Sequence, residues 1–176
     1  MVINIRREEE KDYAESEFVV NSAFEKDEYS DHREKQLVSK LRLSDAFVPE
    51  LSLVAEVEDR IVGHIMHTKL IIKNEDKEEV SLALAPVSVI PEYQRKGIGS
   101  KLINESFKIA KELGFKSMIV LGHADFYPKF GFVPASKWNI KAPFDISDEY
   151  FMAVELVPGG LNNVSGCVKY TKEFFE

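Results

Sequence analysis

The sequence has almost no cysteine: Cys167 is the only one among 176 residues. A single cysteine cannot form an intramolecular disulfide, and it cannot supply a cysteine-rich zinc site. Its apolar surroundings predict that the Cys167 side chain is buried as a small hydrophobe. We therefore expect no metal site and a reducing environment for this protein.

Long apolar runs and an excess of basic residues are also missing. No segment approaches the roughly 20 apolar residues of a membrane span, and the charged residues from Arg6 to Glu10 precede any signal-like apolar stretch. Asp and Glu number 30 against 23 Lys and Arg, a net charge of −7. This balance argues against a nucleic-acid-binding face. We expect a cytoplasmic protein with neither a membrane nor a nucleic-acid partner.

The remaining composition is that of a globular protein, with 44% hydrophobic and 30% charged residues. A chain of this length is ordinarily one domain, and it buries about 70% of its unfolded surface. Neither an internal repeat nor a low-complexity tract nor a linker is visible. Residues 1–176 are therefore predicted to form a single domain.

Hydrophobic periodicity predicts a mixed α/β domain. Apolar residues in alternation or in short runs favour strands at 2–6, 51–56, 61–73, 80–89, 116–121, 150–157 and 167–170. Three- and four-residue spacing favours helices at 8–23, from Ser30 or Asp31 to before Pro49, at 97–113 and, briefly, at 124–130. The three strands between 51 and 89 suggest an antiparallel meander, and the helix 97–113 suggests a parallel crossover.

The most informative segment is VSVIPEYQRKGIGSKL, residues 87–102, where a strand passes through two glycines into a helix. The first N–H groups of a helix have no intrahelical partner. Gly97 and Gly99 let the backbone approach a ligand, and Arg95 and Lys96 add positive charge. The arrangement suits a phosphate or pyrophosphate, although the same glycines could serve only to shape the turn.

Two common nucleotide-binding patterns do not fit this segment. A Rossmann loop would need a third glycine where Leu102 stands, and a Walker A loop would end in Gly-Lys-Ser/Thr. The interpretation that the protein is an enzyme that binds some other phosphate ligand is supported by this loop alone.

A family resemblance adds to this reading. The residues QRKGIG, 94–99, resemble the Gln/Arg-x-x-Gly-x-Gly/Ala pyrophosphate loop of the GNAT superfamily of N-acetyltransferases, and the flank VIPEYQ, 89–94, is similar as well. Downstream, YPKFGF, 127–132, is similar to the Tyr-x-x-x-Gly-Phe segment after the fifth strand of that superfamily. Further segments resemble a YhbS-like subgroup: 53–65, 121–122, 151–156 and 166–170.

The resemblance implies the GNAT fold, a mostly antiparallel mixed sheet flanked by helices, with splayed fourth and fifth strands. Pro86 cannot donate a ladder hydrogen bond and is compatible with interrupted pairing there. The implied reaction uses acetyl-CoA, whose thioester is attacked directly by a primary amine of a small molecule, peptide or protein. The alternative is a non-catalytic acyl-CoA sensor or regulatory module. The oligomeric state is open, a homodimer included.

The resemblance also assigns the cofactor contacts. The strand around Val87, Ser88 and Val89 would offer backbone groups to the pantetheine arm. The pyrophosphate would be wrapped by Gln94, Arg95, Lys96, Gly97, Ile98, Gly99 and Ser100.

Tyr127 matches the tyrosine of the family that protonates the departing thiolate, although it could instead be one of several packing aromatics. A phenol with a pKa near 10 can donate to a thiolate whose conjugate acid has a pKa of about 8.5. Many relatives carry an asparagine seven residues earlier, where Val120 stands here. That departure weakens the transfer of side-chain contacts in this loop.

The general base is less evident. His123, four residues before Tyr127, is the preferred candidate, because only histidine has an unperturbed pKa near neutrality. The other candidates are Glu56, His64, His67 and ordered water. The acidic segment 24–31 occupies the place of the loop that lines the amine site in relatives, and it could attract a cationic amine or be only a solvated connector.

Overall fold

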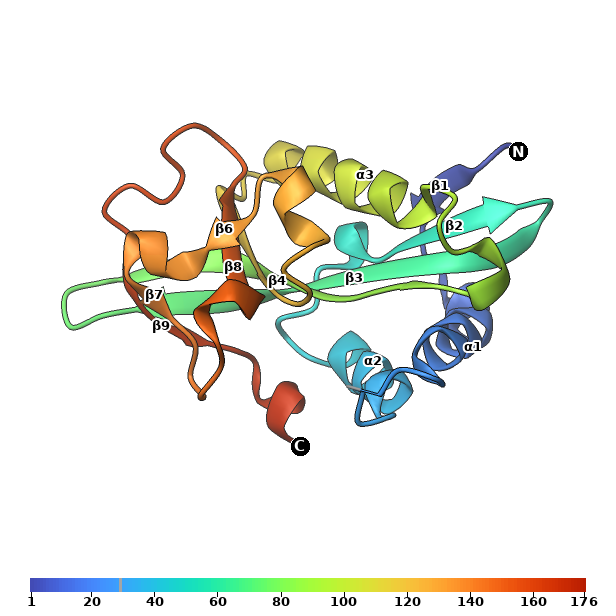
Figure 1. Cartoon of the computed structure of the whole chain (residues 1–176), viewed down its shortest axis with the longest axis horizontal. Coiled ribbons are helices and arrows are strands. Elements are labelled where there is room, and N and C mark those ends of the chain that lie inside the picture. Colours follow the sequence, from blue (N-terminus) through green and yellow to red (C-terminus); the bar gives the residue numbers. More distant parts are fainter. Residues whose placement is uncertain (29) are drawn as a thin grey trace.

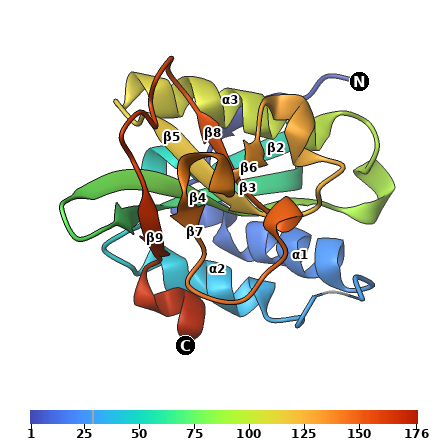
Figure 2. The same cartoon turned by 60° about the vertical axis from the view of Figure 1, so that its left-hand side comes forward.

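The protein is arranged in three layers, as the computed structural model of residues 1–28 and 30–176 shows (Figure 1). A sheet forms the middle layer. Helix α3 (Ile98–Glu112) covers one face, and α1 (Tyr13–Phe24) and α2 (Glu34–Arg42) cover the other. Figure 2 shows the same order of layers from another side. Within the described residues, none of the helices is long and apolar enough to cross a membrane.

The described residues form nine strands in one sheet. They are β1 (Asn4–Arg7), β2 (Leu53–Val57), β3 (Arg60–Lys73), β4 (Glu78–Val89), β5 (Ser117–Leu121), β6 (Val133–Pro134), β7 (Ile140–Lys141), β8 (Phe151–Glu155) and β9 (Gly166–Lys169). Their order is β1-β2-β3-β4-β5-β8-β6, while β9 pairs with β3 and β7. Only β4–β5 and β7–β9 are parallel among the pairs observed here. The expected mixed sheet, with its antiparallel meander and one central crossover, is confirmed.

The meander has a simple physical basis. The turn between β2 and β3 places Glu58 and Asp59 at φ values of 51° and 63°, the left-handed conformation that a tight hairpin requires. Residues 61–68 of β3 are all buried, because helices cover both faces of this strand. A continuous apolar run is typical of a strand that is covered on both faces.

Helix α3 lies unusually close to the sheet at Gly63. A Cβ atom at this glycine would stand 3.0 Å from Ile98 Cγ2 and 3.1 Å from Leu102 Cδ1. Both of those side chains are fully buried on the inner face of α3. The missing side chain at Gly63 therefore holds the first turn of α3 against β3, which fixes the position of the glycine loop.

Several local expectations need correction. The acidic group after β1 does not start an α-helix directly: a single 3-10 turn, Glu10–Asp12, precedes α1. The helix expected at 124–130 is only the 3-10 turn Tyr127–Phe130. Cys167 is exposed rather than buried. In β9 the side chains alternate between faces, so Val168 points into the core and Cys167 points outward.

Candidate functional site

The sheet opens where β4 and β5 separate. The parallel pairing of these strands joins Leu82 to Met118, Ala83 to Ile119 and Leu84 to Val120, and it extends no further. Beyond this point β4 continues to Val89 with β3 as its only strand partner among the described residues. The register of β3 and β4 also shifts here, because two steps along β3 match three along β4. The splayed fourth and fifth strands implied by the resemblance are therefore present.

The hydrogen-bond pattern shows which backbone groups face the opening. The N–H of Ile90 donates to the carbonyl oxygen of Val62 at 3.0 Å. Residues in an antiparallel ladder alternate between bonding to the partner strand and pointing away from it. Val89 and Val87 therefore direct their N–H and C=O groups away from β3, toward the gap. In agreement with this, Gln94 Nε2 donates to the outward carbonyl oxygen of Val89 at 2.9 Å.

The glycine loop forms a concave group of N–H donors at the start of α3. Arg95 and Gly97 both adopt left-handed conformations, with φ values of 63° and 82°. Such residues make successive N–H groups converge, which creates an anion-binding nest. The first free N–H groups of α3 lie directly beyond. A Cβ at Gly97 would meet no atom within 4 Å, so the front of the loop is open, with Arg95 and Lys96 exposed beside it.

Tyr127 lies just after β5, beside the gap. Its side chain is 8% exposed, and its ring makes edge contacts with Phe126 and Phe132 at centroid distances of 5.0 and 5.7 Å. Burial raises the pKa of Tyr127 to about 12. Phe126 in turn approaches Gly99, whose added Cβ would lie 3.8 Å from its ring. One aromatic group thus links the Tyr127 turn to the glycine loop.

The absence of a side chain at Gly122 makes room for the Tyr127 ring. A Cβ at this position would overlap Cε2 of Tyr127, and it would stand 3.0 Å from Cδ2 and 3.2 Å from Cζ. The N–H of Gly122 donates to the carbonyl of Tyr150 at 3.0 Å. Gly122 was recognised in the sequence only as part of a motif, and its contact with Tyr127 was not anticipated.

The four candidate bases occupy different environments. His123 is exposed on the connection between β5 and Tyr127. Glu56 forms an ion pair with Arg6. His67 is completely buried and its Nδ1 lies 2.9 Å from the carbonyl oxygen of Leu51. Burial lowers the pKa of His67 to about 4, so it is neutral near pH 7.

His64 belongs to a buried ionic cluster that sequence reasoning missed. Its Nε2 lies 3.3 Å from Oε2 of Glu8, and the two side chains are 0% and 1% exposed. Arg42 binds the same carboxylate, with Nη2 2.8 Å from Oε2. No spacing rule connects residues 8, 42 and 64, so the sequence offered no signal beyond the charges themselves.

The proposed acceptor loop is only partly described. It follows α1, and Glu25, Lys26 and Glu28 within it are exposed. Tyr29, the central aromatic of this segment, lies outside the described residues.

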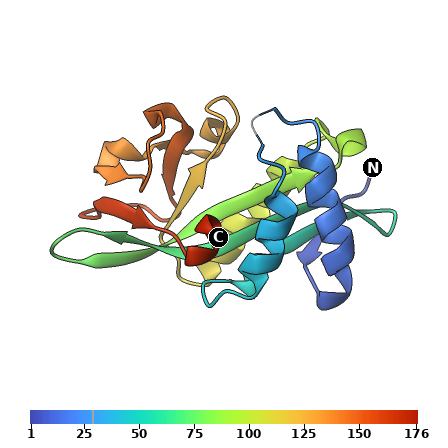
Figure 3. The same ribbon diagram turned by 90° about the horizontal axis from the view of Figure 1, so that it is seen from below.

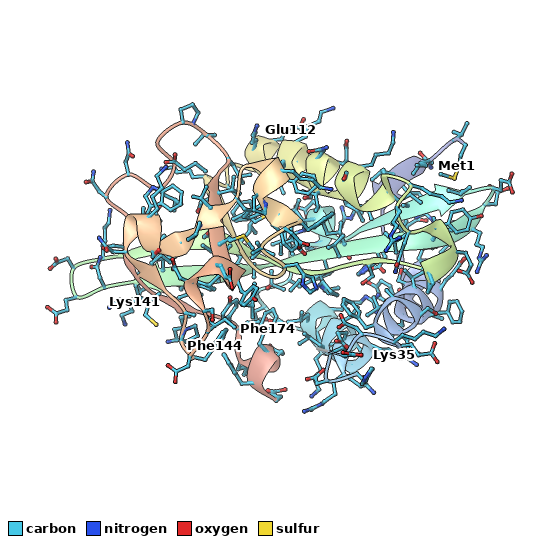
Figure 4. The ribbon with its side chains drawn as sticks, in the orientation of Figure 1. Met1, Lys35, Glu112, Lys141, Phe144 and Phe174 are labelled. Atoms are coloured by element: carbon cyan, nitrogen blue, oxygen red, sulfur yellow. The ribbon has the colours of Figure 1, made fainter. Side chains whose placement is uncertain are left out.

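A second group of aromatic side chains surrounds Tyr170, which follows strand β9. Tyr170 contacts Phe144 at 6.3 Å and Phe174 at 5.1 Å between ring centroids, and Figure 4 shows the two phenylalanines near each other beneath β8.

Within residues 1–28 and 30–176, no group of three or more His, Cys, Asp and Glu side chains is arranged to hold a metal ion.

Comparisons with known proteins agree with this geometry. The model of the acetyltransferase (GNAT) family matches residues 6–132. The uncharacterized N-acetyltransferase YjhQ of Escherichia coli K12 is 39% identical over 119 residues, which make up 67% of this chain and 66% of YjhQ, slightly under two thirds of that relative. The uncharacterized N-acetyltransferase YhbS of the same organism is 29% identical over 142 residues, which make up 80% of this chain and 83% of YhbS.

Two crystal structures are similar over nearly the whole chain. A GNAT family acetyltransferase from Brucella melitensis in complex with acetyl-CoA is 31% identical, with a TM-score of 0.81 and 98% of each chain covered. The E. coli YhbS structure in complex with CoA has a TM-score of 0.88 and covers 99% of this chain and 92% of YhbS. At 23% identity, that structure supports the fold alone.

The chain belongs to the acetyltransferase (GNAT) family.

Proposed function

We propose that this protein, acting as one domain, transfers the acetyl group of acetyl-CoA to a primary amine by direct attack within a ternary complex. The proposal rests on one combined observation: β4 has an unpaired edge, and the glycine loop beside that edge presents a concave group of N–H donors. CoA consists of an amide-containing arm joined to a pyrophosphate, and these two features have the matching chemistry. The relatives seen with CoA and acetyl-CoA support the choice of donor.

The pantetheine arm would pair with the outward backbone groups of Val87 and Val89, beside Ser88. Its amides would take the place of a neighbouring strand, because β5 has already diverged. Gln94 would release the carbonyl of Val89 to the arm. The loop from Arg95 to Ser100 would bind the pyrophosphate through its N–H groups, as an anion at a helix N-terminus is bound.

Tyr127 would stabilise the departing thiolate by hydrogen bonding. Burial raises the pKa of Tyr127 to about 12, so its hydroxyl keeps its proton at neutral pH. Complete transfer to a thiolate whose conjugate acid has a pKa of about 8.5 would be uphill by roughly 5 kcal/mol. Donation of a hydrogen bond to the developing charge is therefore the role that fits this burial.

The acceptor must be an amine that can lose a proton. An ammonium group has no lone pair for attack, so a proton acceptor is needed before the carbon–nitrogen bond forms. His123 is a candidate because it is exposed on the Tyr127 connection. The exposed carboxylates Glu25 and Glu28 would favour a cationic acceptor, whether a small molecule or a peptide or protein amine.

The first test is a calorimetric titration with acetyl-CoA, using Gly99→Val as the control variant. A Cβ at Gly99 fits the fold, with its nearest neighbour at 3.8 Å, while the two methyl groups of valine would intrude on the pyrophosphate path. We expect saturable binding in the wild type and loss of binding in Gly99→Val. Absence of binding in the folded wild type would overturn the proposal.

The second test is thiol release from acetyl-CoA with a panel of small amines and lysine-containing peptides. Turnover that depends on the amine supports the enzyme. Binding without turnover on any member of a broad panel would favour a sensor module instead.

A further inference from the structure

A cluster of charged and hydroxyl side chains lies between the sheet and the helices α1 and α2. Figure 3 shows these two helices lying across that face of the sheet. Glu8 is the centre of this cluster. Arg42 Nε and Nη2 lie 3.2 and 2.8 Å from the two oxygens of Glu8, and Ser52 Oγ donates to Oε1 at 2.8 Å. Arg42 also reaches Glu17 at 3.2 Å, and His64 completes the cluster.

With a neutral His64, the cluster carries one more negative than positive charge. Burial of Glu8 works against its ionisation, yet the contacts with His64 and Arg42 outweigh that effect, so the pKa of Glu8 is held well below its usual range. Two carboxylates, Glu8 and Glu17, then face one guanidinium, Arg42. With neutral His64 the sum is −1, and with protonated His64 it is zero. A proton held on His64 would therefore give the cluster equal numbers of positive and negative groups.

His64 has a second neighbour across the sheet, on strand β4. The β3–β4 register places His64 directly opposite Ser88, and side chains opposite each other in an antiparallel pair share one face, with Cβ atoms about 5 Å apart. Ser88 is 2% exposed. Its Oγ and the Nδ1 of His64 form no hydrogen bond among the described residues, and Nε2 of His64 meets Glu8 only at ion-pair distance. An orphaned buried polar atom costs about 1–3 kcal/mol, so these two groups are expected to pair with each other or with a ligand.

Ser88 connects this cluster to the gap between β4 and β5. It lies between Val87 and Val89, whose backbone groups face the gap. An acyl group that is held along this edge would lie next to the Ser88 residue. The row from the gap inward is then Ser88, His64, Glu8 and Arg42. His64 lies 3.3 Å from Glu8, and Arg42 lies 2.8 Å from Glu8.

We propose that Ser88 and His64 relay the proton of the attacking ammonium inward to the Glu8–Arg42 cluster. This rests on the proposed acetyltransferase function. The ammonium gives a proton to Ser88 Oγ, directly or through one water, while Ser88 passes its own hydroxyl proton to His64 Nδ1. His64 becomes an imidazolium whose Nε2–H faces Glu8. The freed nitrogen lone pair attacks the thioester carbon, the carbon–sulfur bond breaks, and the electron pair leaves with the CoA thiolate. A second proton passes from the newly bonded nitrogen to that thiolate, which gives CoA–SH and a neutral amide. The first proton leaves His64 by the reverse route and is released to bulk water.

The charged and polar groups around His64 are Glu8 after β1, Arg42 on α2, Ser88 on β4 and, along β3, His67. Glu17 on α1 belongs to the cluster through its contact with Arg42. Burial keeps His67 neutral, and only the His64 ring of these two lies against the Glu8 carboxylate.

The first experiment tests the contact between Ser88 and His64 in the absence of an amine acceptor. Imidazole ¹⁵N spectra of the labelled protein are recorded for the wild type, Ser88→Ala and Ser106→Ala. Ser106 is an equally buried serine, but its Oγ bonds within α3, to Ile103, on the opposite face. We expect Ser88→Ala to shift the Nδ1 resonance of His64 and Ser106→Ala to leave it in place. An unmoved Nδ1 resonance in Ser88→Ala would overturn the relay, whatever the outcome for the function.

The second experiment is the pH profile of kcat/KM, measured with the panel amine that releases thiol fastest. Without the relay the amine must arrive already deprotonated, so Ser88→Ala and His64→Gln should shift the acid limb toward the ionisation of the free amine. We expect losses of about 10²-fold near pH 7, convergence with the wild type at high pH, and unchanged affinity for acetyl-CoA.

The kinetic outcomes that would overturn the relay are distinct from failure of the enzyme. Turnover with an unshifted profile in Ser88→Ala would reduce the cluster to a structural element. If His123→Gln shifts the acid limb of the pH profile and Ser88→Ala does not, the exposed His123 accepts the proton of the amine and the relay is overturned. If acetyl-CoA binds but no amine reacts, the proposed function falls and the relay falls with it.

Discussion

Replacing Gly122 by alanine is expected to displace Tyr127 while leaving the cofactor loop intact. The added methyl group would overlap Cε2 of the Tyr127 ring and approach Cδ2 at 3.0 Å. Ordinary carbon–carbon contacts are roughly 3.5–4.0 Å, so the ring must retreat by about 1 Å. It cannot do so freely, because Phe126 and Phe132 pack against it.

The magnitude follows from that displacement. Overpacking of a buried ring costs about 1–3 kcal/mol of unfolding free energy, and a 1 Å misplacement near the reacting atoms can lower the rate about 10²-fold. Gly122→Ala should therefore lower kcat by about 10²-fold and destabilise the fold by about 2 kcal/mol. Its affinity for acetyl-CoA should remain close to that of the wild type, since Gly122 lies outside the loop 94–100.

The assay is thiol release under saturating acetyl-CoA, with urea unfolding and calorimetry on the same samples. A double-mutant cycle isolates the contact: in a Tyr127→Ala background, Gly122→Ala should cost less than about 0.5 kcal/mol, because the ring that it strikes is gone. A wild-type kcat in Gly122→Ala, or an equal stability cost in both backgrounds, would refute the steric reasoning.

Three further predictions concern Tyr127, Glu8 and Arg95. Tyr127→Phe keeps the ring but removes the hydroxyl, so kcat should fall about 10²-fold while the Kd for acetyl-CoA stays the same; full activity would remove the hydroxyl from the mechanism. Glu8→Gln should lower the free energy of unfolding by about 3–5 kcal/mol, against almost no change for Glu10→Gln, whose side chain is exposed. Because the pKa of Glu8 is depressed in the folded state, its stabilisation is present above the unfolded value of about 4.3 and is lost as the pH falls below it; urea unfolding between pH 7 and pH 3 should show a flatter profile for Glu8→Gln. At Arg95, with φ at 63°, glycine should keep the fold within about 0.5 kcal/mol, whereas the β-branched Arg95→Val should destabilise it by about 1–2 kcal/mol and weaken acetyl-CoA binding in calorimetry.

The features that sequence reasoning predicted are those controlled by local signals. The meander follows from apolar runs separated by charged turns, and α3 follows from the spacing of Ile103, Phe107 and Ala110 after two glycines. The splay of β4 and β5 was expected from the family resemblance, with Pro86 only compatible with it, and the strand register now shows it directly. The meander and α3 depend on neighbours within about twenty residues, where periodicity carries information.

The features that were missed depend on long-range contacts. Strand β9 pairs with β3 across about a hundred residues, so the exposure of Cys167 follows from a register that no local pattern encodes. The cluster around Glu8 joins residues from separate helices and strands. Glu8 was predicted from the local sequence only as the first residue of the helix expected at 8–23. In the same way, the contact of Gly122 with Tyr127 exists only because a tight turn folds the ring back over β5.

The divergence of β4 from β5 also means that this protein carries a sheet edge in its interior. An open edge normally invites pairing with another chain, and Pro86 with the register shift beside it makes this edge a poor template for a further strand. A bound pantetheine arm would act as the missing strand, in the manner of β-augmentation. Cofactor binding would then be a step that completes the architecture: the amides of Val87 and Val89 should exchange with deuterium slowly only when the donor is bound.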